Sequence, residues 1–225
     1  MAINHPAYHY IRNHRFEILL ISLLMHLFCG ILVPPDYIIA RLVFVVMTLF
    51  VSLASINISI RKRKRSFVLQ VFLFAVIVSI PLLHEYFENI TYFRHYFSIP
   101  YSLFFLFIFY EISLFLLKPK EITTDLILAA TCGYLVLLEI FVFVLEYFIH
   151  ANPNSLHGVN LSSPMTIMVD LVYFCSITMS SIGYGDITPL THEVKLLTSF
   201  MGISGQFYLI VVLGIMISKF TGTKN

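Results

Sequence analysis

The sequence contains few charged residues and few cysteines. Only 12% of its 225 residues are Asp, Glu, Lys or Arg, whereas 59% are hydrophobic. Soluble domains carry about 25% charged residues, so this composition excludes an ordinary soluble protein and indicates a membrane protein. The three cysteines, Cys29, Cys132 and Cys175, all lie in apolar stretches and are odd in number. They therefore do not indicate a disulfide framework.

Long polar segments are also scarce, because six apolar runs occupy most of the chain. Each run has roughly twenty residues and is long enough to cross the hydrocarbon core as a helix. They lie at 16–33, 38–60, 66–83, 98–117, 123–149 and 193–218. We therefore predict an all-α membrane protein with six transmembrane helices. The small size and short tails favour a prokaryotic inner membrane.

The basic residues indicate the orientation in the membrane. Those that would share one side are Arg12, Arg15, Arg61–Arg65, Lys118, Lys120, Lys219 and Lys224. Only Arg41, Arg94 and Lys195 would lie on the other side. Because cytoplasmic loops are enriched in Lys and Arg, both termini are expected in the cytoplasm. The cluster Arg61–Arg65 needs no role beyond this orientation, although contact with anionic lipid head groups is compatible with it.

One short motif lies between the last two apolar runs. Residues 178–186 read Thr-Met-Ser-Ser-Ile-Gly-Tyr-Gly-Asp and follow a helix-like run that opens with Ser163-Pro164. This stretch resembles the selectivity filter of tetrameric potassium channels, the reference example of a filter lined by backbone carbonyls. The alternative is a Gly-Tyr-Gly-Asp turn in an ordinary loop. Its position after a pore-helix-like segment of a membrane protein favours the filter, and the resemblance continues over residues 123–220.

The resemblance implies roles for the residues of the motif. The carbonyl oxygens of Ser181, Ile182, Gly183 and Tyr184 would replace the water shell of K+, and the Ser181 hydroxyl would add an innermost ligand. The stacked carbonyls require unusual backbone angles. Gly183 and Gly185 can adopt them because glycine has no Cβ atom.

Residues around the motif would support the filter. Tyr173 and Phe174 match the aromatic pair that surrounds it in the family, and Tyr173 is a candidate partner for Asp186 at the outer mouth. Thr178 begins the motif. The sequence departs from the family at Ser181, where Thr is usual. The hydroxyl remains but a methyl group is lost, so a looser innermost site and somewhat lower selectivity are expected.

The last apolar run would form the inner helix of the pore. Gly205 matches the hinge glycine of the family, where the helix bends to open a cytoplasmic gate. For Gly202 and Gly214, close helix packing explains the glycine equally well. The residues that would then face the pore are Gln206, Leu209, Leu213 and Ile217. The last two are candidates for a hydrophobic constriction.

The fourth apolar run, residues 98–117, contains no Lys or Arg. Six-span members of the family often carry basic residues there, which move with voltage, so conventional voltage gating is not expected. We divide the chain into an N-terminal arm at 1–15 and a four-helix, sensor-like domain without gating charges at 16–121. A pore domain at 122–220 and a short cytoplasmic tail at 221–225 follow.

Three of the ionisable residues within the apolar runs are candidates for a particular role, His26, Glu139 and Glu146. His26 is better explained as a neutral histidine bonded across the bundle than as a functional group, although ionisable residues at membrane depth are candidates by default. Glu139 and Glu146 share one helical face, which should therefore meet protein and not lipid. Glu139 is expected to be neutral or hydrogen-bonded. Glu146 is expected to contact the pore helix or the turret, which is the external loop at 150–163. A gating role for either is the less favoured alternative.

One pore loop supplies a quarter of a filter, so a homotetramer is expected. We predict passive, selective K+ conduction, with no cofactor other than permeant ions, no nucleic acid and no small-molecule substrate. A weakly selective cation channel and a modulatory, non-conducting subunit of another channel are the alternatives. An enzyme is disfavoured, because no helix carries a metal-ligand pair and no nucleophile lies beside a base.

Overall fold

The computed structural model describes residues 14–31, 37–56, 68–77, 79, 98–117 and 123–222. Several sequence predictions lie outside these residues. They concern most of the N-terminal arm, the tail after residue 222, the basic cluster Arg61–Arg65 and five further basic residues used for the orientation. Those five are Arg12, Arg94, Lys118, Lys120 and Lys224.

The described part of the chain is almost entirely helical. In order, its elements are α2 (Arg15–Phe28), η1 (Cys29–Ile31), α3 (Tyr37–Ile56), an apolar helix at Val68–Ile77, α6 (Ser98–Leu116), α7 (Thr124–Ala151), η2 (Pro153–Ser155), β1 (Leu156–His157), α8 (Pro164–Met179), β2 (Thr188–Pro189) and α9 (His192–Gly222). The strands β1 and β2 form one short antiparallel pair, with Leu156 opposite Pro189. The predicted all-α class is confirmed.

Three described helices are long and apolar enough to cross a membrane. They are Ser98–Leu116, Thr124–Ala151 and His192–Ser218, which correspond to the fourth, fifth and sixth predicted spans. The first three predicted spans contain α2, α3 and Val68–Ile77, which are shorter or described only in part. The protein is therefore an integral membrane protein, and the full count of six spans stays a prediction.

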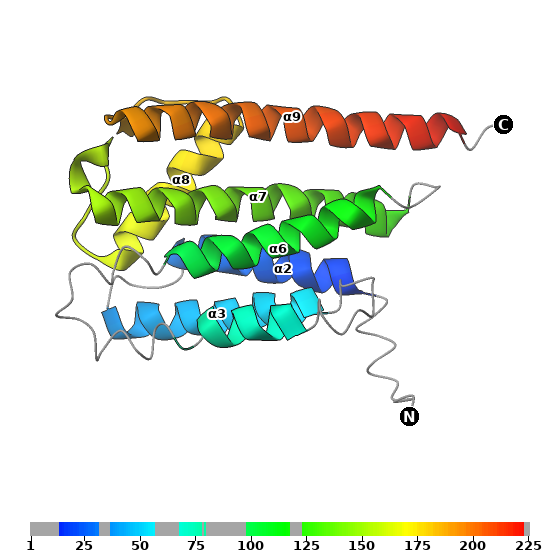
Figure 1. Cartoon of the computed structure of the whole chain (residues 1–225), viewed down its shortest axis with the longest axis horizontal. Coiled ribbons are helices and arrows are strands. Elements are labelled where there is room, and N and C mark those ends of the chain that lie inside the picture. Colours follow the sequence, from blue (N-terminus) through cyan, green and yellow to red (C-terminus); the bar gives the residue numbers. More distant parts are fainter. Residues whose placement is uncertain are drawn as a thin grey trace.

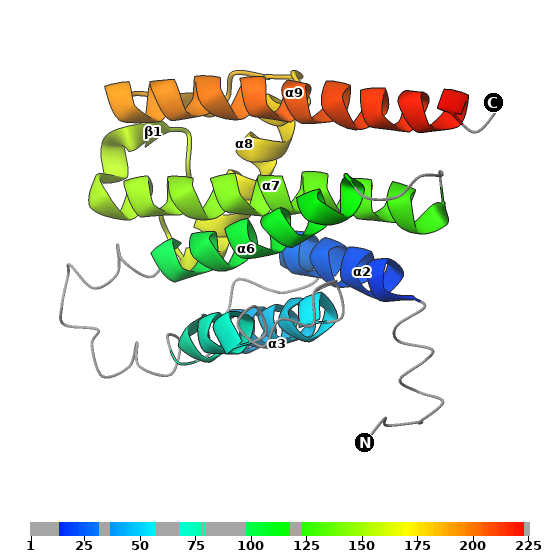
Figure 2. The ribbon, with the colours of Figure 1, turned by 45° about the vertical axis from the view of Figure 1, so that its right-hand side comes forward.

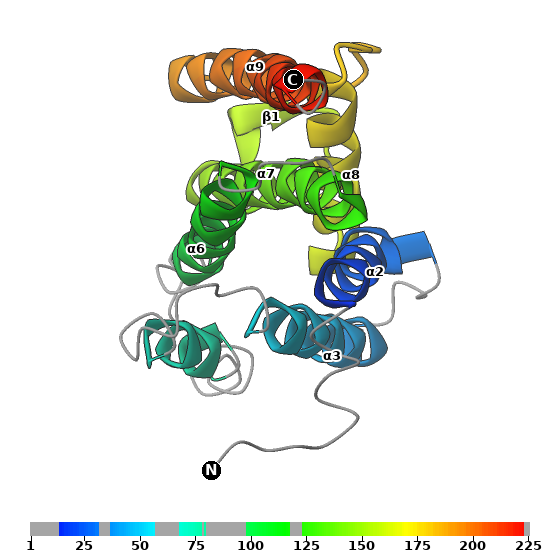
Figure 3. The ribbon, with the colours of Figure 1, turned by 90° about the vertical axis from the view of Figure 1, so that its right-hand side faces the viewer.

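Helix α7 lies at the centre of the described structure. Figure 1 shows α9 along one side of α7, with α6 and α2 on the opposite side and α3 beyond them. The views from other directions agree, and Figure 2 shows α8 crossing obliquely between α7 and α9. Seen end-on in Figure 3, α9 and α3 lie on opposite sides of α7. Helix α7 therefore joins α8 and α9 to the helices on its other side, α2, α3 and α6.

Aromatic packing holds α6 against α7. The Phe143 ring of α7 stacks on Tyr101 at 4.8 Å and on Phe105 at 5.5 Å between centroids, with interplanar angles of 13° and 14°. Such pairs contribute about 0.5–1.5 kcal/mol beyond area burial. Only residues 117–123 separate the two helices, so they remain neighbours in the same chain.

Gly30 lets η1 approach α8 closely. A Cβ atom built on Gly30 would lie 2.4 Å from Cγ2 of Val169. Gly30 therefore allows η1 to pack directly on α8, as small residues commonly do between membrane helices. Near this contact, Cys29 and Met165 form a small buried cluster.

Candidate functional site

The start of α8 is fixed by a capping box. The Ser163 hydroxyl accepts a hydrogen bond from the Thr166 N–H at 3.2 Å, and the Ser163 N–H donates to the Thr166 hydroxyl at 3.1 Å. Pro164 occupies the first turn, where its missing N–H costs nothing. The predicted helix start at Ser163-Pro164 is therefore confirmed, and the helix ends at Met179.

The end of α8 passes into the motif through a Schellman turn. The N–H of Ile182 donates to the Ile177 carbonyl at 2.8 Å, and the N–H of Ser181 donates to the Thr178 carbonyl at 3.1 Å. This pair of bonds places Ser181 at the position after the C-cap, where a Schellman turn usually has a glycine in the left-handed region. Ser181 does have a positive φ, of 61°. Holding a residue other than glycine there costs about 1–2 kcal/mol.

The handedness of the backbone alternates along the motif. Ser181, Gly183 and Gly185 have φ values of 61°, 54° and 81°, whereas the intervening Ile182 and Tyr184 do not have positive φ. When left-handed and right-handed backbone conformations alternate, successive N–H groups point to one side of the chain. The successive carbonyl groups then point to the other side. The expected glycine angles are therefore present at both glycines. Every second residue from Ser181 onward takes part.

The outer end of the motif is bonded to α8. The Tyr173 hydroxyl donates to Asp186 Oδ2 at 2.7 Å and holds the pKa of that carboxyl below its ordinary value. The Tyr184 ring lies parallel to the Tyr173 ring, with 6.5 Å between centroids. Phe174, the other member of the predicted aromatic pair, is buried in the core beneath.

The turret supports the motif from behind. A Cβ atom on Gly158 would lie 2.4 Å from the Asp186 carbonyl oxygen, and Gly158 itself has a φ of 87°. The adjacent strand β1 pairs with β2, which follows the motif directly. Gly158 therefore permits the close approach of the turret to Asp186. Sequence reasoning missed this role, because a glycine in a Gly- and Asn-containing loop gives no distinguishing signal.

Helix α9 is continuous through Gly205. A Cβ atom on Gly205 would lie 3.1 Å from both Cβ and the carbonyl oxygen of Met179, whereas Gly202 and Gly214 have no neighbour within 4 Å in the described chain. Close packing against the end of α8 is thus a direct reason for glycine at 205. The hinge role of Gly205 stays a prediction.

Of the four residues predicted to face the pore, Gln206 contacts the motif. Its side-chain nitrogen donates to the Met179 carbonyl at 3.1 Å and to the Ser181 hydroxyl at 2.9 Å. The other three residues predicted to face the pore are exposed on α9 in the single chain, and they are Leu209, Leu213 and Ile217. The structure thus brings Gln206, but not these three, to the motif.

The comparisons with known proteins bear on this segment. Residues 133–222 match the family model described as "Ion channel". The chain is 33% identical over 89 residues to a two pore potassium channel c of Oryza sativa subsp. japonica, covering 37% of this chain and 19% of that protein. It is 26% identical over 167 residues to potassium channel K2 of Plasmodium falciparum, covering 72% of this chain and 11% of that protein. This segment is therefore similar to ion channels and to proteins named potassium channels.

The channel segment is thus flanked by a longer region of similarity. The match to the Plasmodium protein covers 167 residues and therefore extends beyond the segment 133–222. A two-pore potassium channel 2 of Arabidopsis thaliana is 41% identical over 51 residues, 23% of this chain and 12% of that protein. The chain spans no more than a fifth of these relatives. No solved structure matches it.

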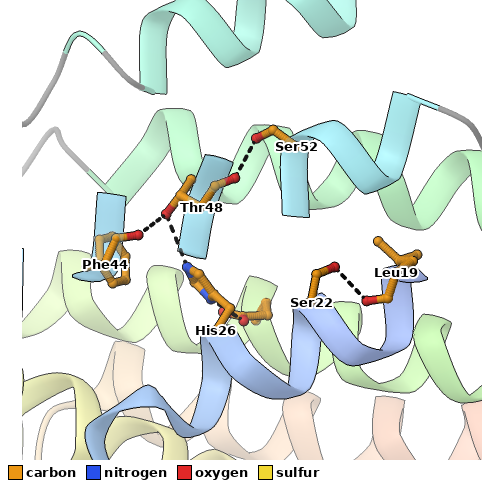
Figure 4. Close-up of polar contacts among 7 residues, drawn as sticks. Leu19, Ser22, His26, Phe44, Thr48 and Ser52 are labelled. Carbon is orange, nitrogen blue, oxygen red and sulfur yellow. Dashed lines mark hydrogen bonds and ion pairs between the residues drawn. The ribbon is translucent and has the colours of Figure 1, made fainter. Parts of the chain in front are cut away.

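A buried polar pair lies behind the channel segment. Nδ1 of His26 on α2 lies 2.6 Å from Oε1 of Glu139 on α7, and both side chains are fully buried. Figure 4 shows the other ring nitrogen of His26 bonded to the Thr48 hydroxyl of α3, at 3.3 Å. Because the Thr48 hydroxyl donates to the Phe44 carbonyl, it accepts from His26 Nε2. One proton must therefore lie between Nδ1 and Glu139 Oε1.

Glu146, also on α7, has a partner close by in the sequence. It was expected to contact the pore helix or the turret at 150–163. Its Oε1 lies 3.7 Å from Nε2 of His150, the first residue of that predicted turret, one turn further along α7. Residues four apart on a helix face each other, so this local pair forms without another element.

Proposed function

We propose that the protein is a potassium-selective channel that conducts K+ passively, with Ser181–Gly185 as its filter. The observation that carries the proposal is the alternating backbone of this segment, with positive φ at Ser181, Gly183 and Gly185. This arrangement suits a row of carbonyls facing one axis, which can replace the hydration shell of K+. The similarity to proteins named potassium channels supports the same conclusion.

The carbonyls of Ser181, Ile182, Gly183 and Tyr184 would coordinate K+, and the Ser181 hydroxyl would provide the innermost ligand. Asp186 would lie at the outer mouth, where a carboxylate raises the local concentration of cations. The hydrogen bond from Tyr173 and the parallel Tyr184 ring would hold the outer filter against α8. No resident cofactor is needed in this mechanism, because K+ is the cargo.

A homotetramer follows from this proposal, because each chain supplies one filter strand. The exposure of α9 supports a tetramer. Only 11% of its apolar stretch is buried in the single chain, against 56% for α7. The exposed apolar residues of α9 include Phe200, Ile203, Phe207, Ile210 and Leu213. In a tetramer, part of this surface would pack on neighbouring copies and part would line the pore.

The channel would not open by a conventional voltage sensor. The one charged residue of α6 is Glu111, and this helix contains no Lys or Arg. A helix without basic residues cannot move the positive charge that makes opening steeply voltage-dependent. Both termini would lie in the cytoplasm, and Arg61–Arg65 would meet the cytoplasmic leaflet.

Ion selectivity tests the proposal directly. The purified protein, reconstituted in a planar bilayer with K+ on one side and Na+ on the other, should show a reversal potential near the K+ equilibrium potential. Openings that reverse near zero would instead establish a weakly selective cation channel, and Ser181 would be the first residue to exchange for threonine. Silence from a folded tetramer that also passes no flux would overturn the proposal in favour of a modulatory subunit.

Exchange of one filter glycine separates conduction from assembly. Gly183 has a positive φ and no atom of its own chain within 4 Å of the Cβ position, so Gly183→Ala strains the backbone without a clash inside the chain. The variant should assemble and lose K+ flux. Gly202→Ala, which adds a methyl group on α9 in open space, is the matched control and should conduct.

A further inference from the structure

Gln206 joins α9 to the base of the filter. It follows Gly205 in the sequence, and its side-chain nitrogen lies 2.9 Å from the Ser181 hydroxyl oxygen and 3.1 Å from the Met179 carbonyl oxygen. The orientation of the amide is fixed by chemistry, because a carbonyl oxygen only accepts hydrogen bonds and the nitrogen must therefore face Met179. Both N–H groups of Gln206 are thus used at the filter base.

The contact with Met179 completes the end of α8. The last four carbonyls of a helix lack intrahelical partners and need donors from elsewhere. In α8, the carbonyls of Ser176, Ile177 and Thr178 receive backbone N–H groups from residues 180–183. Gln206 supplies the donor for the fourth, Met179. The filter therefore begins from a helix end whose carbonyls are all bonded.

The contact with Ser181 bears on the side chain itself. A serine hydroxyl can occupy three staggered positions about χ1, whereas the branched side chain of threonine is restricted in χ1. Ser181 lacks the methyl group that would impose this restriction, and a hydrogen bond from Gln206 selects one position instead. The hydroxyl oxygen has two lone pairs, so one remains for a cation.

We propose that Gln206 is a positioning residue that fixes the Ser181 hydroxyl, and that this pair sets K+ over Na+ selectivity at the innermost filter site. The proposal rests on the proposed function as a K+ channel. In this chain, the hydrogen bond from the Gln206 amide would fix the serine hydroxyl. In threonine, the branched side chain itself restricts the position of the hydroxyl. Selectivity would then depend on a residue 25 positions after Ser181 in the sequence.

A double-mutant cycle tests the proposal. Gln206→Met keeps the length of the side chain and removes both N–H donors, and Ser181→Ala removes the hydroxyl. We expect Gln206→Met to lower the K+ to Na+ permeability ratio about two- to tenfold, the range that the loss of one ordinary hydrogen bond gives. In the Ser181→Ala background, Gln206→Met should have no further effect. An equal fall in both backgrounds would overturn the proposal, because Gln206 would then act through Met179 or through packing.

A rescue variant separates positioning from structure. Ser181→Thr in the Gln206→Met background should restore the permeability ratio, because threonine restricts its own hydroxyl. Lack of rescue in a tetramer as stable as the Gln206→Met parent would count against the proposal. Because a branched residue at positive φ is strained, the thermal stability of each tetramer is measured beside its selectivity.

The chain offers a matched control for the chemical change. Gln70 donates to the Ser55 hydroxyl at 2.7 Å in the peripheral helices. Gln70→Met therefore removes the same kind of hydrogen bond far from the filter and should leave the permeability ratio unchanged. The wild-type ratio is measured first. A non-selective wild type would refute the proposed function, whereas a selective wild type with unaltered Gln206→Met would refute only the role of Gln206.

Discussion

Nδ1 of His26 and Oε1 of Glu139 lie 2.6 Å apart with both side chains fully buried, which ties α2 to α7 across 113 residues of sequence. Phe44, Phe105 and Phe143 surround the imidazole, with ring centroids 5.0 to 6.4 Å away. Water is therefore excluded from a pair that connects α2 to α7, the helix in which the segment similar to ion channels begins. This pair is the most buried polar contact between the periphery and the channel segment in the described residues.

Glu139→Leu should strongly destabilise the protein. It leaves the buried Nδ1 of His26 without its partner, and loss of one member of a buried pair costs about 3–5 kcal/mol. Glu146→Leu on the same helix is the matched control. The pair of Glu146 with His150 is partly exposed, so its loss should cost less than about 1 kcal/mol. Unfolding in detergent measures both, and equal costs would contradict the structural role of the His26 pair.

Gly205→Ala and Gly202→Ala should have opposite effects on stability. A methyl group at 205 would meet Met179 at 3.1 Å, including backbone atoms that cannot easily move, whereas the site at 202 is open in the described chain. Alanine is a better helix former than glycine by about 1 kcal/mol, so Gly202→Ala should be neutral or stabilising. Gly205→Ala should lower the thermal stability of the tetramer. Equal gains from both would show that α9 does not press on α8 there.

Gly133→Ala should disrupt a contact between the outer and inner helices. The Tyr208 hydroxyl of α9 donates to the Ala130 carbonyl of α7 at 2.7 Å, and a Cβ atom on Gly133 would lie 2.1 Å from that hydroxyl oxygen. The expected cost is about 1–3 kcal/mol, as for other overpacked sites. In a Tyr208→Phe background the clashing oxygen is gone, so Gly133→Ala should cost less. Additive costs in a chemical unfolding series would contradict this geometry.

Tyr173→Phe should make the channel more sensitive to external acid. The Tyr173 hydroxyl holds the pKa of Asp186 below its ordinary value. The ionised carboxylate and its hydrogen bond are thus present above that ordinary value and are lost only as the pH falls through the lowered pKa. Between pH 7 and pH 5, the contact of Tyr173 with Asp186 should stay intact, and the current should not change for this reason. In Tyr173→Phe, the acid loss of current should begin at a higher pH.

Tyr147→Phe provides the control for this titration. Tyr147 lies near the outer end of α7, where its ring contacts Phe148 and not the filter. Tyr147→Phe also removes one tyrosine hydroxyl, but it should leave the acid titration of the current unchanged. A shift of the same size in both variants would mean that Asp186 is not the group responsible.

The predicted filter motif is a local feature of the sequence. The residues that make it are contiguous, and Ser163-Pro164 marks the start of the helix before it by local capping chemistry. The positive φ of Ser181 was not predicted, because serine at that position gives no sign of a Schellman turn. The usual signal for such a turn is a glycine.

Contacts between distant helices were harder to predict. His26 and Glu139 were each recognised as buried ionisable residues, but nothing in their spacing shows that they meet. Gln206 was placed on the pore-facing side, yet its bond to Ser181 depends on how closely Gly205 lets α9 approach α8. Glu146 was easier to place, because its partner His150 lies four residues away on the same helix, at the start of the predicted turret. Helix length was equally hard to judge in the first three spans.

The hydrogen bond from Gln206 to Ser181 also makes the permeant ion an effector of the inner helix. If the position of α9 sets the affinity of the innermost site, thermodynamic linkage requires that occupancy of this site favours the same position of α9 by the same factor. Raising K+ should then slow any movement of α9 away from the filter. The ion that crosses the membrane would thereby report its own concentration to the helix that lines its path.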